Sequence, residues 1–161
     1  MTGGKQSRSF GIRAETALKS ILEGLGATVA RASMSLGLFD LVALGSDDVA
    51  LIEVKAVNGV RYYASKSPGT AKAIFELARV AEQCAPNVFA VVAVYFGEID
   101  DFRFFSCDRI LRGPVGPGDA DFEFVLTCAP PPVVLSSPTS PPSESIPKQL
   151  ARKMREAADT V

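Results

Sequence analysis

Two apolar segments joined by a short turn constrain the fold of this chain more than any other feature of its sequence. They cover residues 38–44 and 49–57, and the sequence Gly45-Ser46-Asp47-Asp48 lies between them. A four-residue loop of this composition between apolar runs is typical of a β-hairpin. Because both faces of both segments are mostly apolar, we expect the hairpin to lie within a sheet that is covered on both sides.

Three charged residues interrupt this apolar hairpin. If Leu44 lies opposite Val49, Asp40 lies across from Glu53, and Lys55 follows on the same face because side chains alternate along a strand. Two carboxylates about 5 Å apart repel by roughly 3 kcal/mol at an effective dielectric constant of about 20. Lys55 offsets only one of them, so a divalent cation would balance the excess, and oxygen ligands alone favour Mg²⁺ or Mn²⁺. The alternative is an ordinary Glu53–Lys55 ion pair, with Asp40 capping the entry to its strand.

The composition limits the available chemistry. The 161-residue chain has no histidine, and its three cysteines are widely spaced. This excludes Ser-His-Asp hydrolysis, Cys-His proteolysis, His-ligated zinc and HNH-type nuclease chemistry, so catalysis must use carboxylates, Lys, Arg or hydroxyls. The net charge is −1, and the sequence contains no apolar segment long enough to cross a membrane. We therefore expect a reduced, cytoplasmic protein with no membrane partner.

Apolar periodicity predicts the remaining elements. Helices are expected at 12–25 and 70–84, and further strands at 28–32, 88–96, 102–106 and 122–127. Helices and strands in this order predict an α/β fold, with a mixed β-sheet flanked by α-helices.

The composition changes near residue 129. Residues 129–147 contain seven prolines, which prevent regular pairing and predict an exposed linker. Residues 148–161 follow as a basic amphipathic helix, which either packs on this protein or a second copy of it, or acts as a DNA-binding arm. The predicted organisation is therefore a folded domain at 1–128, a linker at 129–147 and a C-terminal helix at 148–161.

The charged residues of the hairpin carry a resemblance to a known family. Asp40 followed after twelve residues by Glu53-Val54-Lys55, with Glu15 on an upstream helix, resembles the PD-(D/E)xK nuclease signature. Within that superfamily, the arrangement of residues 6–111 is similar to the archaeal-type Holliday-junction resolvases, which also occur in viruses. The proline that usually precedes the first aspartate is replaced by phenylalanine here, and the glutamine often found at the start of the next helix is missing.

The resemblance implies a restriction-endonuclease-like fold and Mg²⁺-dependent cleavage of four-way DNA junctions, with Mn²⁺ as a plausible substitute. A homodimer would make the two symmetric cuts, at the nucleoid or in the cytoplasm of a virus-infected cell. The implied metal ligands are Asp40, Glu53, the Val54 carbonyl and Glu15.

The same resemblance implies roles for individual residues in the reaction. Lys55 would orient or deprotonate the attacking water, and Ser33 would match the serine of the family's catalytic loop. Glu15 is equally a carboxylate at the edge of a helix, and Ser33 is equally part of a polar connector.

Basic residues gather on two segments that flank the hairpin, 1–20 and 55–80, whereas acidic residues concentrate at 98–123. Phosphates would approach the basic segments, and the candidate DNA-binding residues are Arg8, Arg13, Arg31, Arg61 and Lys72. Two other functions remain open: a repair or restriction-type PD-(D/E)xK nuclease, and a non-catalytic nuclease-like module that binds DNA.

Overall fold

The computed structural model describes residues 3–32, 37–124 and 126, with residues 3–8 described by their helical backbone alone. Three α-helices and five strands form the folded part of this region. Their bounds, in chain order, are α1 Gly3–Gly24, β1 Thr28–Arg31, β2 Leu41–Leu44, β3 Val49–Val57, α2 Pro68–Glu82, β4 Val88–Phe96, β5 Asp101–Phe105 and α3 Cys107–Arg112. Short 3₁₀ helices lie at Ala64–Lys66 and Pro117–Asp119.

The five strands form one mixed sheet in the order β1-β2-β3-β4-β5. The β3–β4 pair is parallel, because α2 carries the chain from one strand back to the start of the next, and the other three pairs are antiparallel. The strand that carries Glu53 and Lys55 therefore lies at the centre of the sheet.

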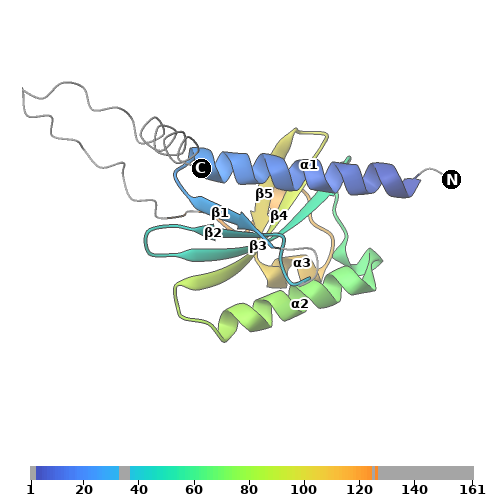
Figure 1. Cartoon of the computed structure of the whole chain (residues 1–161). Helices are drawn as coiled ribbons and strands as arrows, with labels where there is room; N and C mark the ends of the chain where they lie inside the picture. The colour runs from blue at the N-terminus through green and yellow to red at the C-terminus, as the bar shows by residue number, and fades with distance from the viewer. Residues whose placement is uncertain (1–2, 33–36, 125, 127–161) are drawn as a thin grey trace, which may run out of the picture. The chain divides into compact units, whose positions relative to one another are not determined.

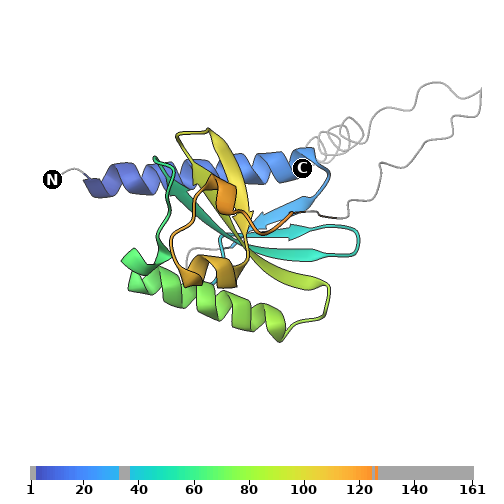
Figure 2. The same cartoon turned by 180° about the vertical axis from the view of Figure 1, so that it is seen from behind.

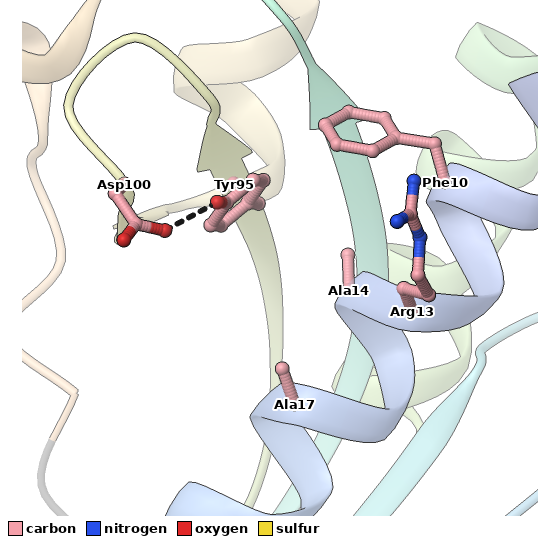
Figure 3. Close-up of a pocket in the computed structure, with 6 residues that line it drawn as sticks. All are labelled: Phe10, Arg13, Ala14, Ala17, Tyr95 and Asp100. Atoms are coloured by element: carbon pink, nitrogen blue, oxygen red, sulfur yellow. Dashed lines mark hydrogen bonds between the residues drawn. The ribbon is translucent and has the colours of Figure 1, made fainter.

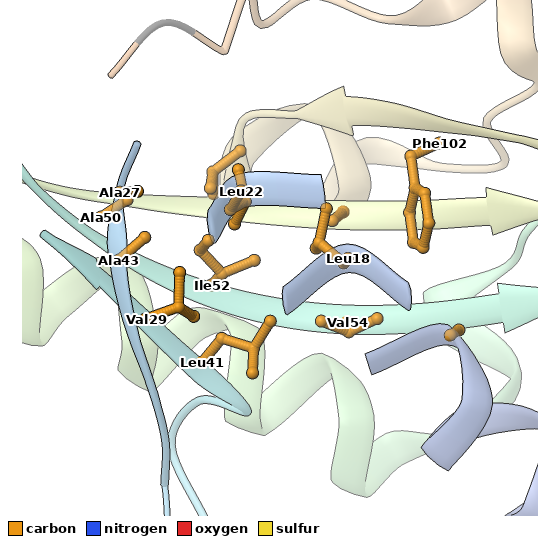
Figure 4. Packing of buried hydrophobic residues seen from close by; sticks show 13 residues of the cluster. Leu18, Leu22, Ala27, Val29, Leu41, Ala43, Ala50, Ile52, Val54 and Phe102 are labelled. Carbon is orange, nitrogen blue, oxygen red and sulfur yellow. The ribbon is translucent and has the colours of Figure 1, made fainter. Parts of the chain in front are cut away.

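Helices cover both faces of this sheet. Helix α1 lies on one face, and α2 and α3 lie on the other, as both views show (Figures 1 and 2). Under α1, Leu18 and Leu22 pack with Ile52 and Val91 in a layer of buried apolar residues (Figure 4). Under α2 and α3, Ile74, Leu77 and Ile110 pack on the alternate residues of β3, β4 and β5.

The predicted hairpin is confirmed. Leu44 pairs with Val49 and Leu41 with Ile52, which is the expected register. The strands at 49–57 and 88–96 also match their predicted bounds. The predicted fold class, a mixed sheet flanked by α-helices, is therefore correct.

Some predicted bounds are wrong, and each has a local cause. Residues 38–40 do not extend β2 as a regular strand: Gly37 before them has a left-handed backbone (φ 58°), and Asp40 binds β3 through both its side chain and its amide. A strand was predicted at 122–127, but residues 122–124 are not in a strand. Phe122 donates one backbone hydrogen bond to the carbonyl of Phe104, and the Phe124 ring stacks on the Phe104 ring. Aromatic packing replaces the ladder of hydrogen bonds there.

The predicted linker and C-terminal helix, at 129–147 and 148–161, lie outside the described residues. None of the helices in the described ranges is long and apolar enough to cross a membrane.

Candidate active site

Glu53 is the centre of the site. It is 6% exposed and is the one buried charged residue among those the structure describes. Its position in β3 explains this burial, because the face that carries it is covered by the α2–α3 layer. Lys55, two residues on and therefore on the same face, forms an ion pair with its carboxylate. Burial raises the pKa of Glu53 above its ordinary value, an effect that Lys55 partly offsets and that the charge of Asp40 reinforces.

Asp40 reaches the site from the entry to β2. Its carboxylate Oδ2 accepts a hydrogen bond of 2.7 Å from the backbone amide of Val54, between Glu53 and Lys55. Its own amide donates to the carbonyl of Ile52, although the Cα partner of Ile52 is Leu41. Two successive residues thus share one partner on β3, which is the pattern of a β-bulge, and a bulge redirects the side chain beside it. The predicted meeting of Asp40 with β3 occurs, but through this bulge and one position outside the regular ladder.

Glu15 projects from α1 toward the same region. It is bound by Arg31 of β1, whose Nη2 lies 2.9 Å from the Glu15 carboxylate and 3.2 Å from the Thr16 hydroxyl. Burial raises the pKa of Glu15, and the charge of Asp40 raises it further, whereas Arg31 lowers it. Glu15 therefore lies within electrostatic range of the hairpin carboxylates, with Arg31 as its direct partner.

The donor set can be tested against the cation that the sequence predicts. Within the described ranges, no three Asp, Glu, His or Cys side chains lie close enough together to hold a metal ion. Two carboxylates, Asp40 at the entry to β2 and Glu53 on β3, lie within electrostatic range of each other, and Asp40 Oδ1 is not used in the bond to Val54. Mg²⁺ is usually held by one or two carboxylates, with water and substrate phosphate completing its shell. The residues present fit that mode, and Glu15 is bound to Arg31 through Oε2 alone.

Two further side chains surround Glu53. The Tyr62 ring packs in the layer under α2 and α3, and its hydroxyl has a raised pKa because of burial and the nearby charge of Glu53. The same causes raise the pKa of the buried Cys107 thiol to about 11, which keeps it protonated at neutral pH. Neither residue supplies a positive charge, so Lys55 is the cation that the described structure places on Glu53.

The candidate DNA-binding residues divide into three groups. Arg13, Arg61 and Lys72 are exposed, on α1, on the loop after β3 and on α2, and can meet a phosphate. Arg31, by contrast, is bound to Glu15. Arg8 lies on α1 with its side chain outside what is described. Ser33, which was predicted as a catalytic residue and not as a DNA-binding one, lies outside the described residues altogether.

A mixed five-stranded sheet with α1 on one face and α2–α3 on the other, and with an aspartate and an ExK strand at its centre, defines the restriction-endonuclease-like fold. Comparison with solved structures identifies the same fold in a particular protein, Hjc of the archaeal hyperthermophile Archaeoglobus fulgidus, a Holliday junction resolvase. The TM-score is 0.54 at 22% sequence identity, over 68% of this chain and 86% of that one. The predicted resemblance is thus confirmed in the fold. No model of a known protein family matches the sequence, and no curated protein matches it either.

Proposed function

We propose that this chain is a metal-dependent DNA endonuclease that selects branched DNA, with four-way junctions as its substrate. The observation that carries the proposal is the burial of Glu53 beside Asp40, with Lys55 on the same strand, at the centre of a nuclease-like sheet. A buried carboxylate beside a second one costs stability unless a cation accompanies them. A fold with only a structural or DNA-binding role gains nothing from that arrangement.

The residues of the site can share the work of hydrolysis. Asp40 and Glu53 would hold Mg²⁺, with the Val54 carbonyl as a further ligand, and the bound ion would stabilise the negative charge on the phosphate and acidify water. Asp40 is held in place for this by the Val54 amide. Lys55 would orient the attacking water and stabilise the charge that develops as a P–O bond to that water forms and the bond to the leaving oxygen breaks.

The preference for branched DNA is the part of the proposal that a substrate panel tests. Labelled four-way junction, flap, nicked and linear duplexes of the same arm sequences are incubated with Mg²⁺ or with a chelator. We expect Mg²⁺-dependent cuts, with the junction cut fastest and at symmetric positions. Faster cleavage of flaps or of linear duplex would indicate a repair or restriction-type nuclease, and binding of every substrate without any cut would indicate a non-catalytic module.

The DNA-binding surface gives a second prediction. Replacing both Arg61 and Lys72 with Gln should weaken junction binding and reduce the slope of log K against log salt, by about one unit per lost phosphate contact. Arg31→Gln is the matched control, because its guanidinium binds Glu15 and should leave the slope unchanged. Salt titrations by fluorescence anisotropy measure both. A slope that depends on Arg31 and not on Arg61 and Lys72 would place the DNA on another surface.

A further inference from the structure

A pocket of about 260 Å³ opens between α1 and the turn that joins β4 to β5. Figure 3 shows the helix on one side and the turn on the other, with side chains from both directed into the space between them. Six residues line it: Phe10, Arg13, Ala14, Ala17, Tyr95 and Asp100. Its volume is slightly below the roughly 300–1,000 Å³ of pockets for drug-sized ligands, which suits a single small planar group.

Two rings, Phe10 on α1 and Tyr95 on β4, form the aromatic wall of the pocket, and small side chains of α1 complete its lining (Figure 3). The rings of Phe10 and Tyr95 meet edge to face, with centroids 5.7 Å apart, and Phe102 supports Tyr95 at 5.2 Å. On the helix, Ala14 and Ala17 keep the space open because their side chains end at Cβ. An aromatic wall beside small side chains is a surface on which a flat ring can stack.

The polar groups at the rim carry opposite charges. The Arg13 guanidinium lies 5.8 Å from the Phe10 centroid, and the Tyr95 hydroxyl donates a 2.5 Å hydrogen bond to Asp100 Oδ1. Asp100 has a φ of 51°, a left-handed conformation that aspartate adopts more readily than most residues. The turn therefore presents a fixed carboxylate that accepts hydrogen bonds, opposite a cation that can bind a phosphate.

The position of the pocket connects it to the candidate active site. Arg13 and Ala14 directly precede Glu15 on α1, so the helical side of the pocket and that carboxylate belong to the same turn of the helix. Glu15 in turn lies within electrostatic range of Asp40. A nucleotide within a DNA strand joins a planar ring to a phosphate, which matches an aromatic surface with a guanidinium at its rim.

We propose that this pocket binds one nucleobase that is unstacked at the branch point of the DNA. The base stacks on the aromatic wall, an exocyclic amino group donates to Asp100, and Arg13 binds the adjacent phosphate. Unstacking a base inside a continuous duplex costs a few kcal/mol, and the cost is smallest where the base is already unpaired. The pocket thereby favours branched over linear DNA. This inference rests on the proposed function, because it assumes that the substrate is DNA.

The test fills the pocket without disturbing the fold. Ala17 is exposed, and leucine has nearly the helix propensity of alanine, so Ala17→Leu should fold normally and occupy the space where the base would lie. Ser20→Leu is the matched control, since Ser20 is also exposed on α1 and does not line the pocket. Binding is measured without divalent cations, so that no DNA is cut, to linear duplex and to a four-way junction with one unpaired nucleotide at the branch.

We expect Ala17→Leu to weaken junction binding about ten-fold, the effect of losing one base–aromatic stack, and to leave duplex binding unchanged. Ser20→Leu should change neither. A 5-iodocytosine at the branch, which keeps an exocyclic amino group, should crosslink to Phe10 or Tyr95 on irradiation, as identified by mass spectrometry. Equal junction affinities for the two variants, an equal loss on duplex and junction, or a crosslink only at other residues would each overturn the proposal. If wild-type protein binds and cuts junctions in those cases, the pocket assignment alone fails; if it binds no DNA, the proposed function fails with it.

Discussion

Replacing Glu53 with Gln is expected to reduce Mg²⁺-dependent cleavage of a four-way junction by on the order of 10³-fold, because a lost metal ligand removes several kcal/mol of transition-state stabilisation. Asp40→Asn should have a similar effect. Both variants should still bind the junction, because affinity for DNA comes mostly from Lys and Arg side chains. Cleavage rates under single-turnover conditions, together with anisotropy measurements of binding, separate the two properties.

Stability gives a readout of the same site that does not depend on activity. Burial raises the pKa of Glu53 above 4.5, so without metal the folded state binds a proton there more tightly than the unfolded state does. The free energy of unfolding that this group contributes therefore falls as pH rises above 4.5 and stays low at neutral pH. Glu53→Gln removes the charge, and the metal-free variant should be as stable as wild type or more stable.

Mg²⁺ should reverse that order. A ligand that binds only the folded state at 100 times its Kd adds about 2.7 kcal/mol of stability, and this gain should be present in wild type and absent in Glu53→Gln. Glu82→Gln, on the exposed end of α2, is the matched control and should respond to Mg²⁺ as wild type does. Full cleavage by Glu53→Gln, or an equal Mg²⁺-induced rise in Tm for both proteins, would contradict the assignment of Glu53 as a metal ligand.

The sequence predicts the centre of the fold well, for a physical reason. A short hairpin loop between two apolar strands leaves few possible registers, and a shift by one residue would turn every side chain to the opposite face. The pairing of Leu44 with Val49 follows from this constraint, and it places Glu53 and Lys55 correctly on one strand. The strand at 88–96 is predictable because its apolar run is continuous and is preceded by a proline.

The partner of Glu15 could not be predicted from sequence. Arg31 binds Glu15 because β1 pairs with β2, where Arg31 lies opposite Leu41, and because α1 crosses the same face. No local pattern encodes those tertiary contacts, so Arg31 was predicted from its charge alone to bind DNA. The bulge at Asp40 was missed for a similar reason, since it depends on a hydrogen bond between its side chain and the Val54 backbone. The pocket beside α1 is likewise made by residues far apart in sequence.

Lys55→Gln has the second large expected effect, and it acts on both stability and cleavage. The Glu53 side chain in this pair is 8% exposed, whereas both partners of the surface pair Lys19–Glu23 are at least 30% exposed. Loss of Lys55 leaves a buried carboxylate without its cation and should cost about 1–3 kcal/mol of unfolding free energy at neutral pH. Lys19→Gln is the control and should cost less than about 1 kcal/mol. Urea denaturation measures both values.

A double-mutant cycle separates the structural role of Lys55 from its catalytic role. Removing both charges, in Lys55→Gln with Glu53→Gln, should recover most of the stability lost in Lys55→Gln, because no buried charge is left unpaired.

Lys55→Arg retains the positive charge and should be close to wild type in stability, but a guanidinium stays protonated at neutral pH and cannot take a proton from water. Cleavage should fall by on the order of 10²–10³-fold in Lys55→Gln, and Lys55→Arg should not restore it if proton transfer is the role of Lys55. Arginine restoring full cleavage would instead show that only the charge is needed. Full cleavage by Lys55→Gln would show that Lys55 serves Glu53 alone, with the reacting water held by other groups.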